Sequence, residues 1–101
     1  MVRIKWLIEA KNDLKEIYDY ISKDSKRYAK LQTERILNKT EILKTFPEAG
    51  KIVSEINLPD IREIIEGNYR IIYRNVNKNR IDILSVHHGA RDLKGRIKSD
   101  L

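Results

Sequence analysis

The chain has 101 residues, of which 41% are hydrophobic and 36% are charged. This length predicts one domain over residues 1–101, and the composition is typical of a folded, soluble protein. Because cysteine is absent, disulfides, thiolate metal sites and cysteine nucleophiles are excluded. No apolar run approaches the roughly 20 residues that span a bilayer. The charged N-terminus predicts no secretion signal, so we expect a cytoplasmic protein with no membrane partner.

The charge balance is strongly basic, with 21 Lys and Arg against 15 Asp and Glu and a formal net charge of +6. Such a balance favours acidic partners such as nucleic acid, the ribosome or an acidic protein segment. Charge alone does not choose among them, because many small lysine-rich proteins bind nothing acidic.

The first half of the chain predicts a strand and two helices. Residues 2–6 alternate between apolar and basic side chains, which indicates a short strand with one buried face. The next stretch repeats its apolar residues at steps of three and four, as an amphipathic helix of about four turns does. Asp24 and Ser25 offer caps for a second helix over residues 26–46, which Pro47 ends. The short connection predicts that the two helices pack as an antiparallel hairpin.

The second half of the chain predicts strands separated by turns. Gly67-Asn68 marks a tight hairpin, because both residues tolerate the positive φ that such turns require. The predicted elements are an irregular strand over 52–58, strands over 61–66, 69–76 and 80–88, and a short helix over 92–101. The order therefore predicts an α+β fold. It comprises a strand, an antiparallel helical hairpin, a three- to four-stranded antiparallel β-meander and a short C-terminal helix.

Both faces of the predicted sheet are partly apolar. Alternation along the middle strand places Arg70, Ile72 and Arg74 on one face. In the last strand, strict alternation places Ser85 and His87 on the same face as Ile81 and Ile83. One face should receive the helical hairpin, and we expect the face of Arg70, Ile72 and Arg74 to be the open one.

Four stretches together form a specific pattern. They are Ala10-x3-Leu14-x2-Ile17-x2-Tyr20-Ile21, Leu43-x3-Pro47-x2-Gly50, Arg62-Glu63-Ile64 with Gly67 to Tyr73, and Ile81-x-Ile83-Leu84-x-Val86 with His87 to Leu93. In this order they resemble the RelE/ParE toxin superfamily, whose members are toxins of type II toxin–antitoxin modules. The ending His-Gly-Ala-Arg-Asp-Leu is similar to that of ParE-like and plasmid stabilisation members.

The resemblance implies partners and three alternative functions. A cognate antitoxin would wrap the toxin with a helix and an extended strand, and operator DNA would be bound only through that antitoxin. ParE-like members poison DNA gyrase, so growth inhibition by gyrase binding is the favoured function. RelE-like members instead cut mRNA in the ribosomal A site without a metal. The third alternative is an inactive remnant that binds only antitoxin and operator. No cofactor is expected in any of them.

A metal-free ribonuclease must activate a 2′-hydroxyl, stabilise phosphate oxygens and protonate the leaving oxygen. The resemblance places Arg70 at a phosphate-binding position of such a site. Arg62 and Glu63 stand where RelE-like members carry paired lysines, and no tyrosine follows His88, so that set is incomplete. Glu63, Arg70 and His88 would imitate the carboxylate, arginine and histidine of YoeB-like members if the three converge on one face.

The candidate residues follow from these comparisons. The catalytic candidates are Arg70, His87, His88 and Glu63, and the target- or phosphate-binding candidates are Arg62, Arg70, Arg74 and Arg91. Each has a plainer structural role: Arg70 would pair with Glu63 or Glu66 across the hairpin, and one histidine would be a hydrogen-bonded core residue. Adjacent histidines in a strand point to opposite faces, so no metal site is expected. Trp6, Tyr69 and Tyr73 are expected to serve packing.

Overall fold

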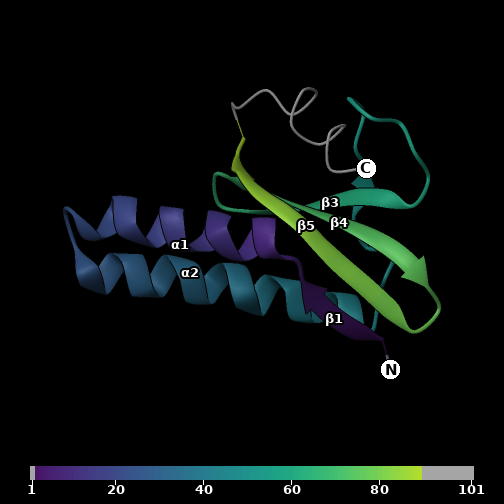
Figure 1. The fold of residues 1–101 in the computed structure, drawn as a ribbon, viewed down its shortest axis with the longest axis horizontal. Helices are drawn as coiled ribbons and strands as arrows, with labels where there is room; N and C mark the ends of the chain where they lie inside the picture. The colour runs from purple at the N-terminus through teal and green to yellow at the C-terminus, as the bar shows by residue number, and fades with distance from the viewer. Residues whose placement is uncertain (1, 90–101) are drawn as a thin grey trace.

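Two helices pack against one face of a five-stranded sheet in the computed structural model, which describes residues 2–89 (Figure 1). The elements are β1 (Arg3–Trp6), α1 (Ile8–Ser22), α2 (Lys26–Glu41), the 3-10 turn η1 (Ile42–Lys44), β2 (Lys51–Ile52), β3 (Ile61–Glu66), β4 (Tyr69–Asn77) and β5 (Arg80–His88). The strand order is β1-β5-β4-β3-β2, in which β1 runs parallel to β5 and the other pairs are antiparallel. The predicted α+β fold is confirmed.

The sheet is larger than the expected meander because both of its edges gain a strand. The N-terminal strand β1 joins the meander through parallel pairing with β5, and the two residues of β2 pair with β3. The predicted C-terminal helix lies outside the described residues. None of the helices within residues 2–89 is long and apolar enough to cross a membrane.

The two helices form the expected antiparallel hairpin. The Ser25 hydroxyl caps α2 by accepting a hydrogen bond from the backbone N–H of Tyr28 at 3.0 Å. The prediction that this helix continues to residue 46 is wrong, because the α-helix ends at Glu41. There the chain tightens into η1, as helix ends commonly do, and the N–H groups of Thr45 and Phe46 then bond the carbonyl of Ile42 before the proline.

The main core lies between the helices and the sheet. Its buried members are Val2, Ala10, Ile36, Leu43, Ile64, Ile71, Tyr73, Ile81, Ile83 and Val86. Trp6 and Tyr69 are partly buried and pack against this cluster, so the packing roles expected for Trp6, Tyr69 and Tyr73 are confirmed. The Tyr73 hydroxyl donates to the carbonyl of Pro47 at 2.9 Å, and burial raises the pKa of its phenol.

A register shift between β4 and β5 changes which side chains of β5 share a face. Ile72 pairs with Ser85 whereas Tyr73 pairs with Ile83, which leaves Leu84 as an extra residue. Ser85 therefore lies on the face away from the helices, and Ile83 lies on the helix face. The strict alternation expected for this strand, which grouped them together, is wrong because of this bulge.

The face away from the helices carries a second, smaller core. Its buried members are Val53, Ile61, Ile72 and Leu84, with Leu7 and Ile56 packed against them. Residues 53–60 lie over this face as a loop, which turns back on itself through hydrogen bonds from Ile56 and Asn57 to the carbonyl of Val53. Asn57 has a φ of 57°, a left-handed conformation that asparagine tolerates.

Two expectations are therefore wrong on this face. The strand expected over residues 52–58 ends at Ile52, because the turn after Val53 breaks the pairing. The face of Arg70, Ile72 and Arg74 is not open along its length, because Ile72 is fully buried beneath the loop.

Candidate functional site

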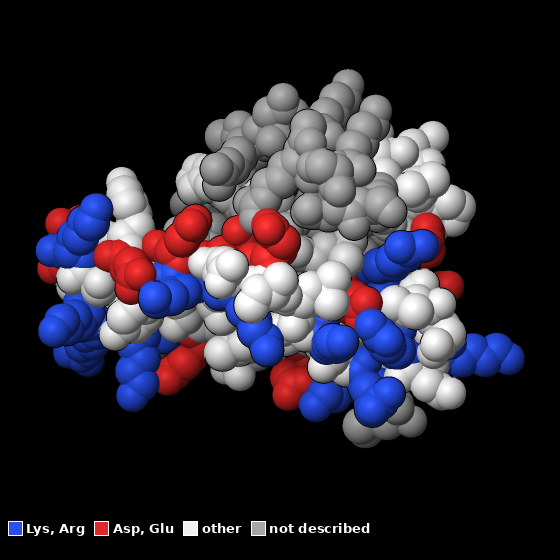
Figure 2. Space-filling view, viewed as in Figure 1, with Lys and Arg blue, Asp and Glu red and all other residues white. Residues whose placement is uncertain are grey.

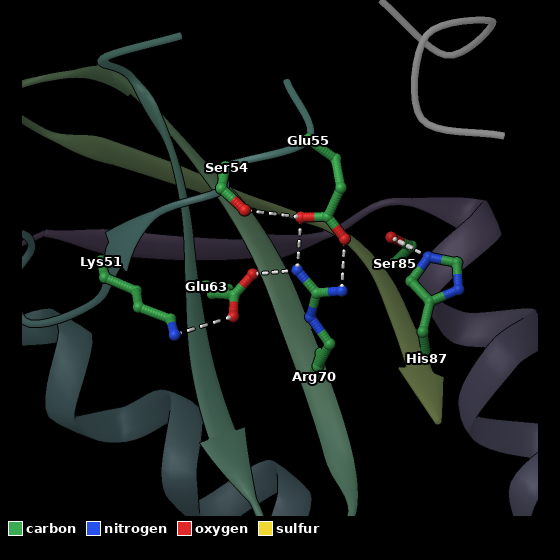
Figure 3. Close-up of polar contacts among 7 residues, drawn as sticks. All are labelled: Lys51, Ser54, Glu55, Glu63, Arg70, Ser85 and His87. Atoms are coloured by element: carbon green, nitrogen blue, oxygen red, sulfur yellow. Dashed lines mark hydrogen bonds and ion pairs between the residues drawn. The ribbon is translucent and has the colours of Figure 1, made fainter. Parts of the chain in front are cut away.

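Arg70 lies between two carboxylates on the face away from the helices (Figure 3). Its Nη1 and Nη2 donate to the two oxygens of Glu55 at 2.7 and 3.0 Å, which is a bidentate pair. Its Nη2 also donates to Glu63. The side chain of Arg70 is 13% exposed and that of Glu63 only 4%, so this is a largely buried charge cluster.

The β3–β4 hairpin brings Glu63 and Arg70 together. Arg70 pairs with Ile65 in the ladder, and Glu63 lies two residues from Ile65 on the same face. Diagonal neighbours of this kind are within reach of long side chains. The plainer role predicted for Arg70, an ion pair with Glu63 across the hairpin, is confirmed. Glu66 pairs with Tyr69 in the ladder and lies on the other face.

Glu55 is the member of this cluster that the sequence did not reveal. It comes from the loop over the second core, where Val53 is fully buried and Ile56 packs against the cluster. These two anchors hold Glu55 above Arg70. A carboxylate in a stretch expected to be a strand gives no signal of a contact with a residue 15 positions away.

The cluster leaves no open cation at Arg70. The hydrogen bond from Arg70 is the main reason that the pKa of Glu55 falls to about 2, from an ordinary value of 4.5. The same bond raises the pKa of Arg70. The ammonium of exposed Lys51 lies 3.9 Å from the second oxygen of Glu63. An incoming phosphate would therefore have to displace Glu55 before it could reach the guanidinium.

The two histidines lie on opposite faces, as expected. His87 pairs with Arg70 in the ladder, is 1% exposed, and has its Nε2 at 2.8 Å from the hydroxyl of Ser85 (Figure 3). His88 is exposed on the helix face, where its ring meets Tyr69 edge-on at 5.9 Å. Arg70 and His88 therefore do not converge on one face, and the histidine that the fold places on the face of Arg70 is His87.

The remaining candidate arginines have different surroundings. Arg62 is partly buried and donates from Nη1 to the carbonyl of Gly50 at 2.8 Å. Arg74 is 46% exposed and pairs with Asp60 at 2.9 Å. Arg91 lies outside the described residues. Among the candidate arginines within residues 2–89, which are Arg62, Arg70 and Arg74, only Arg74 presents a large part of its side chain to solvent. Within residues 2–89, no three His, Cys, Asp or Glu side chains gather as a metal-binding group.

The Glu55–Arg70 pair predicts an acid-dependent loss of stability. Folding lowers the pKa of Glu55. The stabilisation that ionised Glu55 gives the folded state is therefore complete above pH 4.5 and is lost as the pH falls toward 2. Glu55→Gln should therefore flatten the fall in unfolding free energy between these values, by on the order of 1 kcal/mol for a partly exposed pair. Denaturant titrations at several pH values measure this. Glu34→Gln, on the exposed side of α2, should leave the slope unchanged, and an equal effect of both variants would contradict the assignment.

Comparison with known proteins agrees with this architecture. The family model described as the ParE toxin of the type II toxin–antitoxin system, parDE, matches residues 4–93. A solved structure titled as the chromosomal ParDE TA system from P. aeruginosa superposes with a TM-score of 0.71. The two are 24% identical, and the match covers 87% of this chain and 96% of that chain, which shows a shared fold. No curated protein sequence matches the chain.

The chain thus has a helical hairpin on a mixed sheet, and a type II toxin family model matches it over residues 4–93. This fold and this match define it as a type II toxin. The chain belongs to the ParE toxin family.

Proposed function

We propose that the chain inhibits growth in the cytoplasm by binding DNA gyrase, without cutting RNA, and that a cognate antitoxin neutralises it. Two considerations support this proposal: membership of the ParE toxin family, and the resemblance of the sequence to members that poison gyrase. The observation that carries the choice against RNA cleavage is the occupied guanidinium of Arg70.

A metal-free ribonuclease needs a cation that is open to the phosphate in the transition state. In this chain Arg70 already forms a bidentate pair with Glu55 and a further bond to Glu63. The histidine on that face, His87, is almost fully buried. RNA would have to displace Glu55, and with it the loop that the buried Val53 anchors, to reach Arg70. A toxin that acts by binding requires no such rearrangement.

The surface that we assign to the antitoxin is the groove between α1 and α2. The apolar lining of this groove is Trp6, Leu14, Tyr18 and Leu37. Its exposed charged lining is Lys11, Lys15 and Asp19, so two cations stand against one carboxylate. An amphipathic helix with acidic flanks matches such a groove. On the face shown in Figure 2, Lys and Arg lie over both helices and near β1, with Asp and Glu interspersed. Within residues 2–89 the neighbouring strand β1 is an edge strand that pairs only with β5, so its other side offers pairing to the extended strand of the antitoxin.

Gyrase supercoiling tests the proposed target. Purified chain added to gyrase and relaxed plasmid should abolish supercoiling, and co-purified antitoxin should restore it. Uninhibited supercoiling at saturating toxin would refute the gyrase target. If induction then still arrested growth, an RNA target would be favoured. If it did not, the chain would be a remnant that binds only its antitoxin.

The antitoxin groove predicts a separable variant. Leu37 is 42% exposed and lines the groove, so Leu37→Glu should weaken relief by the antitoxin about tenfold or more by placing a charge against an apolar face. Leu31 is 41% exposed on the same helix but does not line the groove, which makes Leu31→Glu the matched control. Antitoxin titration in the supercoiling reaction measures both. Equal relief of the two variants would place the antitoxin elsewhere.

A further inference from the structure

A second apolar groove lies where η1 and the turn after it meet the β4–β5 hairpin. This groove is open to solvent and has a volume of about 1010 Å³, and its apolar lining includes Ile42, Phe46, Pro47 and Ala49. Phe46 is 60% exposed and Ile42 is 42% exposed, so two large apolar side chains of this groove are accessible to a partner. This groove shares no lining residue with the groove between α1 and α2, and the proposed function does not use it.

Hydrogen bonds to one carbonyl hold the two walls of this groove together. Tyr73 on β4 donates its hydroxyl to Pro47 at 2.9 Å, and the Asn75 amide donates to the same carbonyl at 3.3 Å. Because Tyr73 is fully buried in the main core, the turn that carries Phe46 is anchored to the sheet. The groove is therefore formed before any partner arrives, which reduces the entropy lost on binding.

The charged residues of the groove indicate what fits it. Glu48 comes from the turn and Lys78 from the tip of the β4–β5 hairpin, and both are exposed. Neither forms an ion pair with another residue in the described range 2–89. A uniformly acidic partner would match Lys78 and repel Glu48, and a basic partner would do the reverse. A partner that carries both charges in inverted order matches both.

A second copy of this chain has that inverted order. We propose that two copies form a two-fold symmetric dimer through this groove. Phe46 of each copy inserts into the apolar groove of the other, and Glu48 lies against the partner's Lys78. In a two-fold interface each contact occurs twice, so both ion pairs form at once. This dimer is independent of the gyrase proposal.

Charge reversal tests the dimer with its own internal control. Glu48→Lys and Lys78→Glu each place like charges against one another twice, so each variant alone should associate at least about tenfold more weakly than the unmodified chain. An equimolar mixture of the two variants should recover association. Every cross-contact in the mixed dimer is again between opposite charges. Analytical ultracentrifugation over a concentration series measures all four samples.

Two results would overturn the dimer. One is a monomeric unmodified chain at every concentration reached. The other is a mixture of the variants that associates no better than each variant alone.

The apolar contact has a separate test. Phe46→Glu should give a monomer, whereas Ile8→Glu, at a 70% exposed residue outside the groove, should remain dimeric. Circular dichroism confirms that both variants are folded. Dimerisation of Phe46→Glu to the same extent as Ile8→Glu would refute the proposed contact. Loss of gyrase inhibition in Phe46→Glu, with a monomeric unmodified chain, would assign the groove to the target instead of to a second copy.

Discussion

Arg70→Ala is expected to lower the free energy of unfolding by about 3 kcal/mol, because it leaves a buried carboxylate without its partner. The side chain of Glu63 is 4% exposed, and its main neutralising group is the guanidinium of Arg70. Lys51, at 3.9 Å and largely exposed, compensates only in part, which places the effect at the lower end for a broken buried pair. Urea denaturation followed by circular dichroism measures the loss.

Two controls separate this effect from a general loss of charge. Arg74→Ala breaks a pair whose side chains are 46% and 40% exposed, so it should cost no more than about 1 kcal/mol. The triple variant Arg70→Met, Glu55→Gln and Glu63→Gln should recover part of the lost stability, because no buried charge then remains unpaired. Equal costs for Arg70→Ala and Arg74→Ala would show that the cluster around Arg70 is not buried in solution.

Gly50→Ala is the second substitution with a large expected effect, of about 3 kcal/mol, and its cause is steric. A Cβ at this position would lie 2.5 Å from the backbone oxygen of Glu63. It would also lie 2.7 Å from the hydroxyl and 2.8 Å from the ring of Tyr73. The sheet fixes the first of these atoms, and the fully buried ring fixes the others. Relief therefore requires movement of the turn that Gly50 shares with Pro47.

Gly89→Ala is the matched control, because its Cβ would have ordinary contact at 3.4 Å with the backbone oxygen of Asn68. We expect a change below about 1 kcal/mol there. Thermal and urea unfolding of both variants decide the matter. A Gly50→Ala protein as stable as the Gly89→Ala protein would mean that the turn is looser than the hydrogen bonds to Tyr73 indicate.

Local patterns predicted the strands that turn residues delimit in the sequence. Strands β3 and β5 have the predicted bounds, because turn-forming residues border both in the sequence. Gly67-Asn68 follows β3, Asn79 precedes β5 and Gly89 follows it. Periodicity did not predict the parallel pairing of β1 with β5 or the short β2. Both depend on contacts between distant segments. The bulge at Leu84 was also unpredictable, because it adds a residue without changing the hydrophobic pattern.

The candidate site was predictable only where one hairpin contains it. The pairing of Arg70 with Glu63 follows from the register of β3 and β4, both of which the sequence places correctly. The contact with Glu55 depends on a loop that is held by a second core on the face expected to be open. Because this loop was not expected, the sequence predicted an accessible Arg70, whereas in the fold Glu55 and Glu63 pair with its guanidinium.

The most direct test of the central claim is primer extension on mRNA from a programmed translation reaction, at the toxin concentration that stops gyrase. If the chain acts by binding gyrase and the pairing of Arg70 with Glu55 and Glu63 persists, no new mRNA ends will appear at ribosomal A sites. New ends that disappear in a folded Arg70→Lys protein would contradict this account and establish the chain as a ribonuclease.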